Sequence, residues 1–106
     1  MSTQTITEFL EARIAEDEYD ANRELLWGTT QTLTRMNARI VDECAAKRAI
    51  IKSYQSCVYA EAATDITKEF GVKLTVSGMV KGLELAIKSL AATYRDHADY
   101  REEWAL

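Results

Sequence analysis

The chain of 106 residues contains no proline and only four glycines, so few positions force the backbone out of a helix. Proline is the most disruptive residue in a helix interior, and glycine is the next most unfavourable. Alanine, leucine, glutamate, lysine and arginine, which favour helices, are frequent. The composition therefore predicts an all-α protein, and the length predicts one helical domain over residues 1–106.

The sequence also has little of what enzymes and metal proteins use. His97 is the only histidine, and Cys44 and Cys57 are the only cysteines. A zinc site needs three or four ligands at suitable spacing, and no phosphate-binding glycine loop, nucleophile elbow or metalloprotease motif occurs. We therefore expect no enzymatic activity, no cofactor and no bound metal.

No apolar run approaches the roughly 18–20 residues of a membrane span, and the N-terminus lacks the basic-then-apolar pattern of a signal peptide. Two cysteines do not form the disulfide framework of a small secreted protein. Cys44 lies on an apolar helical stripe and is expected in the core, whereas Cys57 lies off it. We expect a cytoplasmic protein that does not bind membranes.

The charge is unevenly distributed. Residues 8–24 hold seven acidic and two basic side chains, whereas residues 35–52 hold five basic and two acidic ones. We favour two helices of opposite charge packed side by side, and a charged partner is the alternative interpretation. The overall net charge of −4 disfavours nucleic acid as the partner.

Apolar residues recur at every third or fourth position between residues 33 and 58, which is the pattern of an amphipathic helix. Lys47 is the only charged member of this stripe, and Glu43 precedes it in the favourable order for an ion pair. A core-facing ammonium must reach the rim or meet a carboxylate. The alternative interpretation of Lys47 is that it belongs to a polar cluster shared with other helices. The stripe consists of Leu33, Met36, Ile40, Cys44, Lys47, Ile51, Tyr54 and Val58.

The first helix is expected over residues 6–27. Thr5 and Glu8 have the spacing of a capping box, in which each residue bonds the backbone of the other. Gly28 suits the left-handed position after the helix. A threonine-rich connection is expected over residues 29–34.

The central helix is expected to break near residues 53–56, because about forty continuous helical residues would be atypical for a small domain. Its second piece should end at Gly71, and the last long helix should span residues 77–94. Tyr100 and Trp104, four residues apart, should dock a short terminal helix. The sequence therefore predicts a small, mostly antiparallel helical bundle of three long helices and short connecting or terminal ones.

Residues 65–83 resemble a helix-turn-helix, with Gly71 at the turn and a second helix that would enter the major groove. The valine after the turn falls one residue early, and Gly78 and Gly82 weaken the second helix. The surrounding charge is near neutral, whereas DNA binding depends on neutralising phosphates. An ordinary helical turn is the simpler interpretation.

Three stretches, residues 9–18, 43–51 and 94–104, resemble an uncharacterised family of small proteins from actinobacteria and their phages, a domain of unknown function. The last stretch has the pattern Tyr-x-Asp-His-x-Asp-Tyr-x-x-x-Trp, and Ala98 stands where the family usually has proline. The resemblance implies no established activity.

We expect the charged residues of these three stretches to converge on one side of the bundle, where they would satisfy each other. The cluster would be either a binding site or a polar network that fixes the fold. For His97, a turn or cap residue that bonds the backbone is the alternative. The expected cluster consists of Glu16, Asp17, Glu43, Lys47, Arg48, Asp96, His97, Tyr100 and Trp104.

The function that these observations favour is a non-enzymatic protein-interaction module, phage-encoded, that binds a host or phage protein. Charged faces and two tryptophans offer the anchors that interfaces use. The alternative is a DNA-binding regulator that uses residues 65–83. Self-association is compatible with the sequence, which does not fix an oligomeric state.

Overall fold

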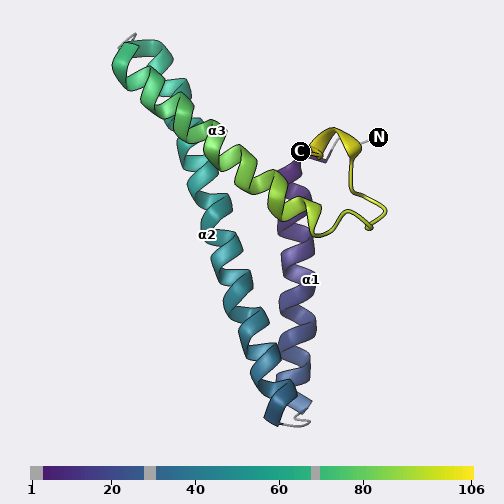
Figure 1. Ribbon diagram of the computed structural model, residues 1–106. Helices are drawn as coiled ribbons and strands as arrows, with labels where there is room; N and C mark the ends of the chain where they lie inside the picture. Colours follow the sequence, from purple (N-terminus) through teal and green to yellow (C-terminus); the bar gives the residue numbers. More distant parts are fainter. Residues whose placement is uncertain (1–3, 28–30, 68–69) are drawn as a thin grey trace. The chain divides into compact units, whose positions relative to one another are not determined.

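The computed structural model describes residues 4–27, 31–67 and 70–106, which form three long helices and one short one (Figure 1). The long helices are α1 (Ile6–Trp27), α2 (Gln31–Thr67) and α3 (Phe70–Ala92), and a 3-10 helix, η1, spans Glu102–Trp104. These described ranges contain no strand. The predicted all-α class, with three long helices and a short terminal one, is confirmed.

The chain divides into two compact units, Met1–Ala49 and Ile50–Leu106, and the boundary falls inside α2. In the first unit, α1 runs antiparallel to the first part of α2 (Figure 1). In the second unit, the rest of α2 runs antiparallel to α3, and the segment that carries η1 follows α3. That both units form a single domain stays a prediction.

A capping box starts α1, as expected. The Glu8 amide donates to the Thr5 hydroxyl oxygen at 3.2 Å, and the Thr5 amide donates to a Glu8 carboxylate oxygen at 3.1 Å. This backbone donor, together with the Thr5 hydroxyl, holds the pKa of Glu8 below its ordinary value. The helix continues unbroken to Trp27, and Gly28 lies outside the described residues.

The predicted break near residues 53–56 is wrong, because α2 is continuous over 37 residues. That segment loses the apolar periodicity, but it contains neither proline nor glycine and its serines and glutamine are compatible with a helix. The predicted threonine connection is also too long, since α2 already begins at Gln31.

The predicted end of a helix at Gly71 is wrong as well. Gly71 lies in the first turn of α3, and Gly78 and Gly82 lie in its interior. Helix propensity is a weak signal that tertiary packing overrides, and α3 buries Val80, Ile87 and Ala91. The glycine turn expected of a helix-turn-helix is therefore not at Gly71, and DNA binding by residues 65–83 stays a prediction.

Each unit has its own small set of buried side chains. The central stripe of α2 is buried at Cys44 and Ile51, whereas Leu33, Met36 and Val58 near its ends are exposed, so the predicted core-facing stripe is confirmed only in its middle. In the first unit the buried apolar residues are Phe9, Leu10, Ile14, Ala21 and Cys44, and in the second they are Ile51, Val80, Ile87, Ala91 and Trp104.

The segment after α3 is held by its aromatic residues. Trp104 is buried, and its ring meets that of Tyr100 edge to face, with ring centres 5.7 Å apart. The short helix η1 contacts α3. The predicted docking of a short terminal helix is confirmed, although Tyr100 precedes η1 and only Trp104 lies within it.

Among the residues that the structure describes, none of the helices combines the length and apolar character needed to cross a membrane.

The capping box gives a direct test of how α1 begins. Thr5→Ala removes the hydroxyl that accepts the Glu8 amide and should lower the free energy of unfolding by about 1 kcal/mol. Thr5→Ser keeps the hydroxyl and should leave stability close to that of the wild type. Urea unfolding followed by circular dichroism measures both, and an equal loss in the two variants would show that the cap does not stabilise α1.

Candidate functional site

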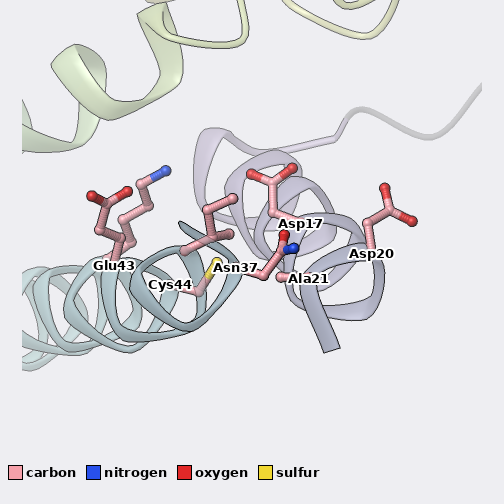
Figure 2. Close-up of a pocket in the computed structure, with 8 residues that line it drawn as sticks. Asp17, Asp20, Ala21, Asn37, Glu43 and Cys44 are labelled. Carbon is pink, nitrogen blue, oxygen red and sulfur yellow. The ribbon is translucent and has the colours of Figure 1, made fainter. Parts of the chain in front are cut away.

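A groove of about 290 Å³ lies in the first unit, between α1 and the first part of α2 (Figure 2). Its residues come from one face of each helix, because positions three or four apart lie together on a helix surface. Within the described part of the chain, its lining consists of Asp17, Asp20 and Ala21 from α1 and Asn37, Ile40, Glu43, Cys44 and Lys47 from α2.

The groove has an apolar base and polar sides. Ala21 and Cys44 are 2% and 1% exposed, and both are small, buried side chains. In Figure 2, Asp17 on α1 and Glu43 on α2 extend their carboxylates toward the same side of the helix pair. A ligand in the groove would therefore meet apolar surface below and carboxylates beside it.

Carboxylates outnumber cations in this lining. Asp17, Asp20 and Glu43 are acidic, and Lys47 is the one basic lining residue among those described. Glu43 pairs with Arg39 at 3.2 Å, and both side chains are largely exposed. The surplus of carboxylates in this lining therefore favours a cationic group over an anionic one.

The thiol of Cys44 is a packing group. Its sulfur donates to the Ile14 carbonyl at 3.8 Å, across the contact between the two helices. Burial raises the pKa of Cys44, and the carboxylates of Asp17 and Glu18 raise it further. Because the thiolate is the nucleophilic form, this thiol is held in its unreactive state. The prediction that Cys44 is a core residue is confirmed.

A two-fold hydrogen-bonded ion pair joins the helices beside the groove. Arg48 donates to both carboxylate oxygens of Glu18, at 2.5 and 3.2 Å. These bonds lower the pKa of Glu18 and raise that of Arg48. The expectation that an acidic helix packs beside a basic one is confirmed at this pair.

The first-unit members of the expected cluster are only partly brought together. Asp17, Glu43 and Lys47 line the groove, whereas Arg48 pairs with Glu18 instead. Glu16 is exposed and pairs with Arg13 at 3.0 Å, one turn earlier on the same helix.

The tail members of the expected cluster belong to the second unit. Asp96 is exposed, and the Nδ1 atom of His97 accepts the Asp99 amide at 3.0 Å. His97 thus bonds the backbone in a turn, which was the alternative interpretation of this residue. Tyr100 and Trp104 form the ring contact described above. That these residues converge with the first-unit groove stays a prediction.

Sequence reasoning missed Glu18, Asp20 and Asn37. The signal for two of them was present: Asn37 precedes Ile40 by one helical turn, and Asp20 follows Asp17 by one. Extending the helical periodicity of α1 and α2 to their polar neighbours would have found both. Glu18 could not be chosen from the sequence, because several carboxylates in that run could have met Arg48.

Across the described ranges, no three His, Cys, Asp or Glu side chains are placed to hold a metal ion together. The chemical capacity of the groove follows from the side chains that line it. It can accept hydrogen bonds from a cationic or amide donor at its carboxylates, and it can cover a short apolar stem at Ala21 and Ile40.

The Glu18–Arg48 pair predicts a measurable coupling. In a double-mutant cycle with Glu18→Gln and Arg48→Gln, urea unfolding should give about 0.5–1 kcal/mol of interaction, because the pair is only partly exposed and makes two bonds. The matched cycle at Glu43 and Arg39, which are 54% and 82% exposed, should give less. Equal values for the two pairs would contradict this ranking.

The coupling should also depend on pH. The pKa of Glu18 is lowered in the folded state, so its stabilising contribution is complete above the ordinary value of 4.5 and is lost as the pH falls through the lowered folded value. Repeating the cycle at acidic pH measures this loss, and a coupling that grew on acidification would contradict the assignment.

One family model matches the chain. The family described as being of unknown function, DUF6221, matches residues 28–106, and the chain belongs to this family. The match spans α2, α3 and the tail, so it includes Asn37, Glu43 and Lys47 of the groove but not the α1 residues. Neither the curated proteins nor the solved structures gave a match.

Proposed function

We propose that this member of the family is a non-enzymatic protein-interaction module, encoded by a phage of actinobacteria, that binds a host or phage protein in the host cytoplasm. The observation that carries the proposal is the groove of the first unit. Its carboxylates stand beside an apolar base between two helices, which is an arrangement suited to one long basic side chain of a protein partner.

A lysine or arginine side chain suits both parts of this groove. Its aliphatic stem would cover Ala21 and Ile40, and its charged head would meet Asp17 and Asp20. Arginine is enriched at the energetic centres of interfaces, where its stem is buried and its head is paired. The proposed partner therefore presents a basic residue on its binding surface.

Exposed apolar side chains of the same unit could extend the contact. Tyr19 on α1 is 67% exposed, and Leu33 and Met36 on α2 are 42% and 55% exposed. Tyrosine and methionine are enriched in interfaces relative to the rest of a protein surface. These three residues would add apolar contact area to the interface, beyond the contact that one basic side chain of the partner makes in the groove.

The proposed phage origin rests on sequence resemblance. Two of the three stretches that carry it, residues 43–51 and 94–104, lie within the part of the chain that the family model matches. The first of these contains Glu43, Cys44 and Lys47 of the groove. The groove and the resemblance therefore share residues.

Affinity capture from an actinobacterial lysate tests the proposal. The bait is the full chain, with Asp17→Asn/Asp20→Asn as the groove variant and Glu102→Gln/Glu103→Gln as a control with the same charge change on exposed tail residues. We expect one dominant protein that survives nuclease treatment. Its apparent affinity should fall about tenfold or more with the groove variant and stay unchanged with the control.

Two outcomes contradict the proposal. Capture of proteins only through nucleic acid, lost on nuclease treatment, would favour DNA binding by residues 65–83. A captured protein that binds the groove variant and the wild type equally well would remove the groove from the interaction. Mass spectrometry of the eluted fractions distinguishes the two.

A further inference from the structure

The two helices that form the groove contribute charge of different sign. On the α1 side, the charged lining residues are both acidic, Asp17 and Asp20. On the α2 side they are Glu43 and Lys47, and the carboxylate of Glu43 accepts a hydrogen bond from Arg39 at 3.2 Å. Because Arg39 offsets the charge of Glu43, the ammonium of Lys47 gives the α2 side a net positive charge.

The charges of Lys47 and Asp17 both act at the base of the groove, where Cys44 is buried. Lys47 follows Cys44 by three residues on α2, so the two side chains lie on neighbouring positions of one helix face. Burial and the carboxylate of Asp17 raise the pKa of the Cys44 thiol, whereas the ammonium of Lys47 lowers it. A ligand over Cys44 would therefore lie between a carboxylate and an ammonium.

Both charged groups have the capacity to bind a ligand. Lys47 and Asp17 are half-buried, so each keeps part of its side chain on the surface of the groove. An ammonium has three donors, and a carboxylate has about four acceptor positions. A contact that either group makes within the chain therefore leaves sites for a ligand.

We propose that the groove selects a basic residue that carries a carboxylate beside it, and that Lys47 is the residue that determines this specificity. The inference rests on the proposed function, in which the basic side chain meets the acidic side of the groove. Here the neighbouring carboxylate of the partner accepts a hydrogen bond from Lys47. The carboxylate is either that of a chain end or that of an adjacent acidic side chain, since both have the same chemistry.

The size of the groove agrees with this ligand. Its volume of about 290 Å³ is at the lower end of the range for small-ligand pockets. It is therefore suited to a single basic residue and the carboxylate next to it, rather than to a whole helix of the partner.

The sign of the charge effect makes the role of Lys47 testable. The chain has a net charge of −4, so long-range attraction favours the ligand with the higher positive charge. A carboxylate on the ligand lowers its charge by one and would weaken binding if only this attraction acted. Tighter binding of the carboxylate form therefore requires a local cation in the groove.

An NMR titration of the 15N-labelled full chain with two ligands tests the proposal. Acetyl-arginine has a free carboxylate, and acetyl-arginine amide lacks it. At about 150 mM salt, which screens the long-range attraction, acetyl-arginine should bind about two- to fivefold more tightly, the gain expected of one partly exposed ion pair. The Kd values are read from the amide signals of the groove residues.

Variants of Lys47 show whether it causes the preference. Lys47→Gln should abolish or reverse it, and Lys47→Arg, which keeps the positive charge, should retain it. Lys52→Gln is the matched control, because Lys52 is an exposed lysine on another face of α2 and does not line the groove. It should leave the preference unchanged. The amide spectrum of each variant reports whether its fold is preserved.

A third ligand identifies the source of the carboxylate. Acetyl-Arg-Glu amide carries its carboxylate on the following side chain rather than at a chain end. Tighter binding of this peptide than of acetyl-arginine would indicate an internal basic-acidic pair of the partner, and the reverse order would indicate a C-terminal basic residue.

Two results would overturn the inference, and a third would reach further. Acetyl-arginine amide that binds in the groove as tightly as acetyl-arginine would remove the role of the carboxylate while leaving the proposed function intact. A preference that persists in Lys47→Gln would exclude Lys47 as its cause. If none of the three ligands shifts the groove signals, the proposed binding of a basic side chain fails as well.

Discussion

The close contact between α1 and the first part of α2 depends on two small buried side chains. Cys44 reaches the Ile14 carbonyl of the facing helix through a single sulfur atom, and Ala21 is buried on the other helix. Larger residues at these positions would have to separate the helices, because protein interiors are close-packed and accommodate added volume poorly. The distance between the helices in turn sets the width of the groove and brings Glu18 within reach of Arg48.

The contact between α1 and α2 fixes the positions of the side chains that line the groove. The groove side chains stand on continuous helices rather than on loops, so their spacing is fixed by helix geometry. The pair of Glu18 and Arg48 holds the two helices in register beside the groove. The same small residues that stabilise the helix pair therefore create the surface proposed to bind a partner.

Local signals in the sequence predicted local features well. The capping box at Thr5 and Glu8, the burial of Cys44 and the docking of Trp104 each depend on a few neighbouring residues or on one periodic pattern. The predicted helix boundaries were wrong where helix propensity competed with tertiary packing. Gly71, for example, was expected to end a helix but lies within α3. The groove was found only in part, because the choice of carboxylate that meets Arg48 depends on helix rotation, which the sequence does not specify.

An NMR titration tests most directly whether the groove binds a basic side chain. Adding acetyl-arginine amide to the 15N-labelled chain should shift the amide signals of Asp17, Asp20 and Glu43 first, with a Kd in the millimolar range expected for so small a ligand. Asp17→Asn/Asp20→Asn should abolish these shifts. Equal shifts at the exposed tail acids Glu102 and Glu103 would mean that any carboxylate suffices, and would contradict the claim.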